Sequence, residues 1–104
     1  GANRCGEVKL VYFSPLAETD LVEIGIYIAR DNPKRALSFI DELEIKCEAL
    51  GEFPGTGVMR QDVAADLRML PHASYLIFYR AQEDHVRIER ILHRARDVDA
   101  LMGE

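Results

Sequence analysis

The stretch "SYLIFYRAQEDHVRIERILH" (residues 74–93) contains two segments in which apolar side chains recur at every second position. This period is typical of β-strands, and the polar residues 82–84 between them are enough for a hairpin turn. A shorter apolar segment, "LRMLP" (67–71), precedes them and completes a predicted three-stranded meander. In the first of these strands Tyr75, Ile77 and Tyr79 share one face, and in the second Val86, Ile88 and Leu92 share one face with Arg90 among them.

Upstream of the meander, the sequence predicts one more strand and two helices. Residues 7–14 alternate like a strand, and a polar residue followed by proline starts a helix at Pro15 and again at Pro33. Proline is favoured there because its missing N–H costs nothing in the first turn. Gly51 follows the second helical stripe, and we expect it to end that helix in the left-handed conformation. The short link predicts an antiparallel helical hairpin.

The resulting order is βααβββ, with a short helical turn expected over 96–102. We therefore predict an α+β fold in which the helical hairpin packs on one face of an antiparallel sheet. The 104 residues form a single predicted domain, 1–104. A chain of this length buries roughly 65% of its unfolded surface. We expect residues 1–6 to lie outside the folded part.

Composition excludes several classes of protein. The net charge of −5 argues against general or sequence-specific nucleic-acid binding, because phosphates require cations. The charge is uneven, since residues 58–96 carry seven arginines and no lysine. No run approaches the roughly 20 apolar residues needed to cross a bilayer. Three histidines and two cysteines lack any known ligand spacing, so we expect no metal or cofactor. So few cysteines favour the cytoplasm over an oxidising compartment.

Metal-free RNA cleavage would require an acid, a base and cations around one phosphate. The candidate catalytic residues are Arg68, Arg90 and His93. In a regular strand, Arg90 and His93 point to opposite faces, so they could share a phosphate only across a bulge. The alternative is that His93 is a strand-end imidazole bonded to the backbone or to a carboxylate such as Asp97. We favour this alternative over catalysis.

Arg90 lies in an apolar row, and a buried guanidinium must be paired. Two interpretations remain open. Arg90 bonds an acid or a carbonyl within the fold, with Asp97 or Asp20 as candidates. Alternatively, it lies in a groove of the sheet and meets a carboxylate of a partner.

Three segments resemble the ParE branch of the RelE/ParE superfamily of bacterial type II toxin–antitoxin modules. They are "SPLAETDLVEIGIYIARDNPKRA" (14–36), "LRMLPHASYLIFYR" (67–80) and "VRIERILHRARD" (86–97). Each motif alone is modest, but together they follow the order of the family and cover most of the chain. The resemblance implies a RelE-like βααβββ fold, matching the order derived above.

The resemblance also implies a toxin that a cognate ParD-like antitoxin, of the ribbon–helix–helix type, wraps and neutralises. RelE-like members cut mRNA on the ribosome, whereas ParE-like members poison DNA gyrase. The "LHRARD" ending (92–97) is similar to the ParE type, so we expect binding rather than enzymatic catalysis. A ribosome-dependent endoribonuclease is the alternative. A module that binds only its antitoxin is the third hypothesis.

A partner could dock on two surfaces. A second apolar stripe on the first helix, beside the stripe that faces the core, needs either the second helix or a partner to cover it. An exposed face of the sheet could offer tyrosine and arginine anchors. The candidate residues are Val22, Ile26 and Ala29 on the stripe, and Arg68, Tyr75, Tyr79, Arg80 and Arg90 on the sheet.

Overall fold

The computed structural model describes residues 8–97, and the predicted order of elements is confirmed. The predicted helical turn over 96–102 falls largely outside these residues. A two-residue strand, β2, adds to the prediction within the loop that follows the second helix. The elements are β1 (Leu10–Phe13), α1 (Pro15–Ala29), α2 (Pro33–Ala49), β2 (Val58–Met59), β3 (Arg68–His72), β4 (Tyr75–Ala81) and β5 (His85–His93).

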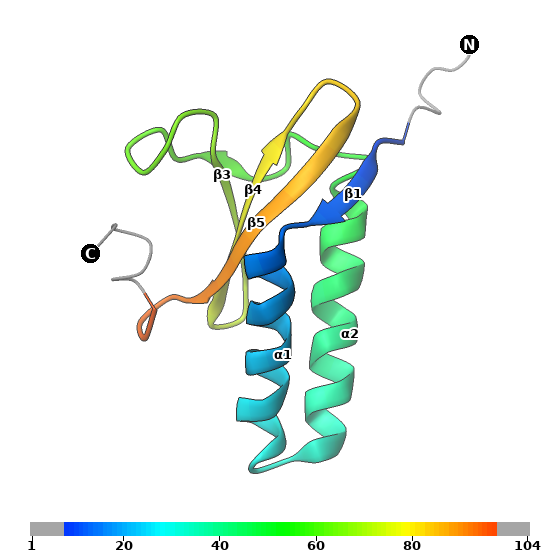
Figure 1. Ribbon diagram of the computed structural model, residues 1–104, viewed down its shortest axis with the longest axis vertical. Coiled ribbons are helices and arrows are strands. Elements are labelled where there is room, and N and C mark those ends of the chain that lie inside the picture. Colours follow the sequence, from blue (N-terminus) through cyan, green and yellow to red (C-terminus); the bar gives the residue numbers. More distant parts are fainter. Residues whose placement is uncertain (1–7, 98–104) are drawn as a thin grey trace.

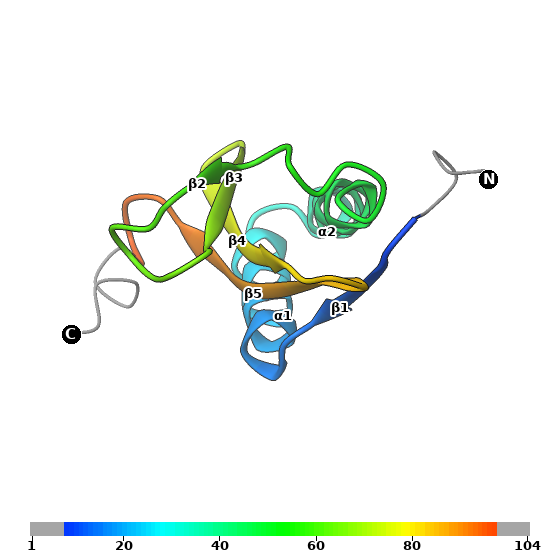
Figure 2. The same cartoon turned by 90° about the horizontal axis from the view of Figure 1, so that it is seen from above.

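The strands form one sheet in the order β1-β5-β4-β3-β2 (Figures 1 and 2). The strands β2 to β5 pair antiparallel, but β1 runs parallel to β5. The prediction of an antiparallel sheet was therefore wrong at this edge, and the sheet is mixed. Parallel pairing requires a long crossover, and the helical hairpin together with the meander supplies it.

The helices begin where the sequence predicted. The hydroxyl of Ser14 accepts the Ala17 N–H at 3.0 Å, and the Asn32 side chain accepts the Arg35 N–H at the same distance. The end of α2 differs from the prediction, because Gly51 does not adopt a positive φ. A Cβ on Gly51 would lie 2.3 Å from the Lys9 carbonyl oxygen, so glycine is required by the close approach of the chain before β1.

The two helices lie side by side against one face of the sheet, as predicted, and extend beyond it to their connecting turn (Figures 1 and 2). The main core lies between the hairpin and this face. It includes Leu43 and Cys47 of α2 with Ile77 of β4 and Ile88 of β5, all fully buried. A second, smaller cluster lies on the other face of the sheet and consists of Leu67, Phe78 and Leu92.

The predicted rows of side chains in β5 are wrong after Ile88, because this strand contains a β-bulge. Tyr79 pairs with Ile88 and Phe78 pairs with Arg90, which leaves Glu89 as an extra residue. A bulge of this kind shifts the following residues to the opposite faces. Leu92 therefore joins the second cluster instead of lying with Val86 and Ile88 in the main core.

Tyr79 connects the core to the loop after α2. Its hydroxyl donates to the Pro54 carbonyl at 2.8 Å and accepts the Gly57 N–H at 2.7 Å. A Cβ on Gly57 would lie 2.8 Å from that hydroxyl, so the loop can pack here only with glycine. The hydroxyl thereby satisfies one donor and one acceptor of a loop that has little regular structure of its own.

We predict that Tyr79→Phe lowers the free energy of unfolding by about 1–3 kcal/mol, because two backbone groups lose their partner. Urea unfolding followed by circular dichroism measures the change. Tyr75→Phe is the matched control, because the only hydrogen bond of the Tyr75 hydroxyl within residues 8–97 is a long one of 3.4 Å from Arg96. Equal effects of the two substitutions would contradict the role assigned to the Tyr79 hydroxyl.

Candidate partner-binding surfaces

Arg90 is held inside the fold by Asp20 of α1. Its Nε and Nη2 atoms donate to the two carboxylate oxygens at 2.9 and 3.0 Å, and the Ile91 N–H donates to the same carboxylate at 2.9 Å. The hydrogen bonds that Arg90 donates to Asp20 are the main cause that raises the pKa of Arg90. Of the two interpretations that the sequence left open, the intramolecular pair is confirmed, with Asp20 as the partner.

His93 is the last residue of β5, and its ring lies against the backbone of the residues that follow it. Its Nδ1 accepts the N–H groups of Ala95 and Arg96 at 3.2 and 3.0 Å. Its own backbone N–H donates to the Asp97 carboxylate at 2.9 Å, and its ring packs edge-on against Tyr75. The prediction that His93 is a backbone-bonded imidazole at the end of a strand is confirmed.

The structure does not bring the three candidate catalytic residues together. Arg68 pairs in register with Tyr79, and His93 pairs with Tyr75, four residues away along β4. Four residues of a strand span roughly 13 Å. Arg68 donates to the Gly57 carbonyl at 2.7 Å, and Arg90 lies on the other face of the sheet, bonded to Asp20. No single phosphate could contact all three residues in this arrangement.

Tyr75 and Tyr79 do not lie on an exposed face. They are 5% and 0% exposed and belong to the core under the helical hairpin, so the predicted exposure was wrong. Alternation places both side chains in one row, but it does not say which row the helices cover. Arg80, by contrast, is partly exposed, and it bonds the Glu89 carboxylate at 3.0 Å and the Ala65 carbonyl at 3.1 Å.

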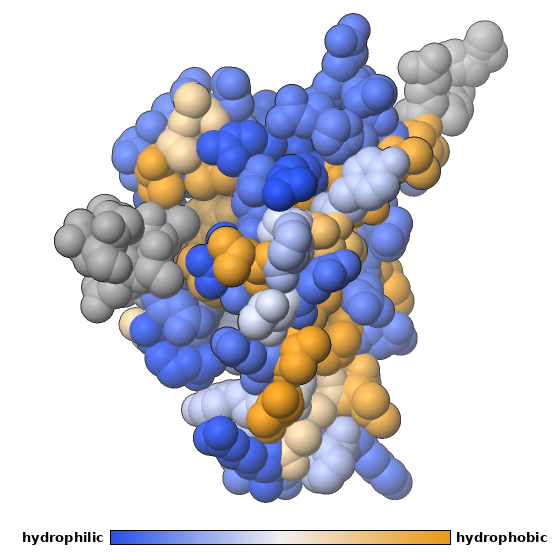
Figure 3. Space-filling model, in the orientation of Figure 1, coloured by the Kyte–Doolittle hydropathy of each residue, from blue (hydrophilic) through white to orange (hydrophobic). Residues whose placement is uncertain are grey.

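The second stripe of α1 lines a groove between the two helices. Val22 and Ile26 are 61% and 56% exposed, so they do not simply pack against α2. The groove has a volume of about 1040 Å³, and apolar side chains gather over this part of the molecule in Figure 3. The floor and the other side of the groove are formed by residues that were not predicted to line it, Gly25, Leu37 and Ile40. Leu37 is an apolar residue outside the buried stripe of α2, and this position was the sequence feature that could have indicated its place in the groove.

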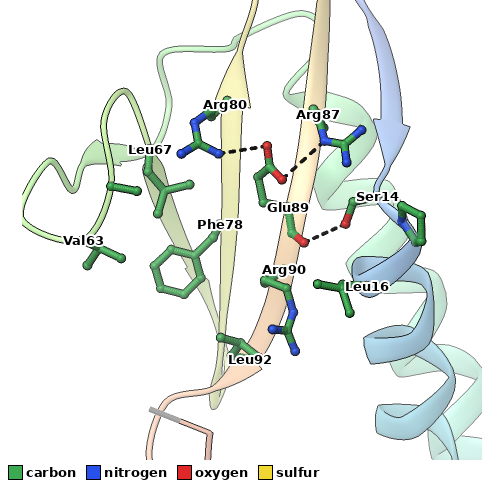
Figure 4. A pocket seen from close by; sticks show the side chains of 12 residues that line it. Ser14, Leu16, Val63, Leu67, Phe78, Arg80, Arg87, Glu89, Arg90 and Leu92 are labelled. Carbon is green, nitrogen blue, oxygen red and sulfur yellow. Dashed lines mark hydrogen bonds and ion pairs between the residues drawn. The ribbon is translucent and has the colours of Figure 1, made fainter. Parts of the chain in front are cut away.

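A smaller cleft of about 540 Å³ lies on the sheet face away from the hairpin (Figure 4). The second cluster forms its floor, and side chains from the start of α1 and from the loop before β3 form its walls. Three arginines and Glu89 stand at its rim, and they include the predicted Arg80 and Arg90. Glu89 and Arg87 were not among the predicted residues, because the bulge that brings Arg90 beside them is not visible in the alternation.

Other chemistry has little support among residues 8–97. No group of three or more metal-ligating side chains occurs in this part of the chain. Cys47 is a buried free thiol, and desolvation raises its pKa to about 12, so it is not a nucleophile at neutral pH. Within the described segment, neither helix has the length and hydrophobicity that a membrane-spanning helix requires.

Comparisons with known proteins agree with this architecture. Residues 11–98 match the family described as "ParE toxin of type II toxin-antitoxin system, parDE". The chain is 31% identical over 97 residues to Toxin ParE1 of Caulobacter vibrioides. This alignment covers 92% of this chain and 100% of that protein. A solved structure titled "Chromosomal ParDE TA system from P. aeruginosa" has a TM-score of 0.71 at 19% identity, and the match covers 85% of this chain and 98% of that one. With the family match extending over most of its length, the chain belongs to the ParE toxins of type II toxin–antitoxin systems.

Proposed function

We propose that this protein inhibits bacterial growth in the cytoplasm by poisoning DNA gyrase, and that a cognate antitoxin of the ribbon–helix–helix type neutralises it. Membership of the ParE family supports a toxin role, and the titles of the family and of the similar structure both name a toxin–antitoxin pair. The antitoxin segment that covers the toxin would fold on binding, since an isolated short helix is marginal in water.

The observation that carries the antitoxin part of the proposal is the uncovered apolar groove on the hairpin. An exposed apolar surface of this extent is a common mark of a protein interface. A groove between two antiparallel helices suits the apolar face of a third helix. Three acids, Glu18, Asp41 and Glu44, stand among its lining residues. They favour an antitoxin helix with lysine or arginine beside its apolar face.

The separation of Arg68, Arg90 and His93 favours a binding toxin over a ribonuclease. Catalysis of RNA cleavage needs a proton acceptor, a proton donor and cations within hydrogen-bonding reach of one phosphate. Here the imidazole Nδ1 is engaged by backbone N–H groups, and the guanidinium of Arg90 is engaged by Asp20. Gyrase poisoning requires only a complementary surface.

We predict that induced expression of the toxin alone arrests growth, with filamentation and a DNA-damage response, while cellular mRNA stays intact. Co-expression of the small gene next to the toxin gene should restore growth. Purified toxin added to gyrase and plasmid should accumulate cleaved DNA, which gel electrophoresis detects. Message cut in the presence of translating ribosomes, with gyrase unaffected, would replace this proposal by the ribonuclease alternative. No effect of expression on growth would favour a module that only binds its antitoxin.

We further predict that Ile26→Asp weakens antitoxin binding at least about tenfold, because a charge would have to be buried where an apolar side chain now docks. Isothermal titration with the purified antitoxin measures the dissociation constant. Ile45→Asp is the matched control, since Ile45 is 64% exposed on α2 and does not line the groove. Unchanged affinity for the Ile26 variant, or an equal loss for both, would show that the helix docks elsewhere.

A further inference from the structure

The bulge in β5 gathers charge on the face of the sheet away from the hairpin. In a regular strand, two of the three residues Arg87, Glu89 and Arg90 would share a face and the third would oppose them. The extra residue places Arg90 on the same face as Phe78, where the row of Arg87 and Glu89 also lies. All three therefore surround the cleft of about 540 Å³, which Figure 4 shows from close by.

The charges at this rim do not balance. The Glu89 carboxylate accepts from the Arg80 Nη1 at 3.0 Å and from the Arg87 Nε at 3.3 Å, so two guanidinium groups share one carboxylate. Arg90 is already neutralised by Asp20. The rim therefore carries one surplus positive charge. The side chain of Arg87 is 45% exposed, and neither of its Nη atoms has a hydrogen-bond partner within residues 8–97.

The walls and floor of the cleft are apolar. Phe78 and Leu92 form the floor, and Leu16 at the start of α1 is an exposed apolar side chain on the rim. The volume lies within the range of roughly 300–1,000 Å³ that is typical of small-ligand sites, which is room for a short stretch of side chains. An occupant that fits would place an apolar side chain against Leu16 and a carboxylate against the free edge of the Arg87 guanidinium.

We propose that this cleft binds an acidic, apolar peptide segment of a protein partner, which lies in it as an extended chain. Planar guanidinium groups pair well with carboxylates, and the surplus charge matches one of them. Nucleic acid fits less well, because it commonly requires several phosphate contacts and aromatic faces for stacking. Here the single aromatic floor residue, Phe78, is 1% exposed, and the whole chain carries a net charge of −5.

The test uses synthetic peptides, so it does not depend on gyrase or on the antitoxin. A blocked hexapeptide of alternating glutamate and leucine is titrated into labelled toxin and followed by NMR. The amide signals of Leu16, Arg87 and Glu89 should shift and saturate. Hexapeptides of alternating lysine and leucine, or glutamate and serine, should bind at least about fivefold more weakly, because each removes one kind of contact.

Two substitutions sharpen the test. Glu89→Gln should tighten binding of the glutamate–leucine peptide by about threefold or more, because it frees two guanidinium groups from the internal carboxylate. Glu83→Gln is the matched control, since it makes the same charge change at an exposed position outside the cleft. Arg87→Gln should weaken binding by a similar factor, and its exposed position leaves folding intact.

Three results would overturn the proposal. One is the absence of any shift with the glutamate–leucine peptide. The second is equal tightening by Glu89→Gln and by Glu83→Gln, which would mean a general charge effect. The third is tighter binding of a uridine hexanucleotide at the same amides, which would identify the cleft as a nucleic-acid site. Failure here leaves growth arrest and antitoxin binding unaffected, so it can be told apart from failure of the proposed function.

Discussion

The arrangement of this fold depends on the hydrogen bonds that the Asp20 carboxylate accepts from β5. Asp20 is 7% exposed, and its carboxylate accepts three hydrogen bonds, two from the Arg90 guanidinium and one from the Ile91 N–H. A buried carboxylate without partners would cost several kcal/mol, so the helix and the strand must meet in this register. The contact joins α1 to β5 immediately after the bulge at Glu89. It therefore fixes where the helix lies and which way the end of the strand faces.

Both candidate surfaces follow from this constraint. With one side of α1 held against β5, the stripe with Val22 and Ile26 remains uncovered beside α2 and forms the hairpin groove. On the other face of the sheet, the ion pair with Asp20 neutralises Arg90. The surplus positive charge at the cleft therefore resides on Arg80 and Arg87, which share the Glu89 carboxylate. The molecule thus presents an apolar groove with acids at its rim and a separate cleft with arginines at its rim. A partner that contacts both would need opposite charges in its two contacting segments.

Much of the fold could be predicted from the sequence, because local signals define it. Proline after a polar cap marks the start of each helix, and alternation marks the strands. What failed depends on tertiary contacts. Alternation placed Tyr75 and Tyr79 in one row but could not show that the helices cover that row. The direction of β1 is decided by its pairing with β5, and Gly51 is required by a chain far away in sequence.

The sites were predicted less completely, and one extra residue explains most of the difference. The bulge at Glu89 moves Leu92 to the second cluster and brings Arg90 into the same rim as Arg87 and Glu89. Nothing in the alternating pattern marks such an insertion. By contrast, the requirement that a buried guanidinium needs a partner led to Asp20 as one candidate for Arg90, beside Asp97, a backbone carbonyl and a carboxylate of another protein. Asp20 is the partner that the structure shows.

A double-mutant cycle between Asp20→Asn and Arg90→Leu, measured by urea unfolding, tests the central role of this ion pair. The asparagine keeps an acceptor for the Ile91 N–H, so the cycle isolates the link to the guanidinium. We predict that each variant is destabilised and that the coupling energy is about 1.5 kcal/mol or more, because the pair is mostly shielded from water. A coupling energy within about 0.5 kcal/mol of zero would contradict the account.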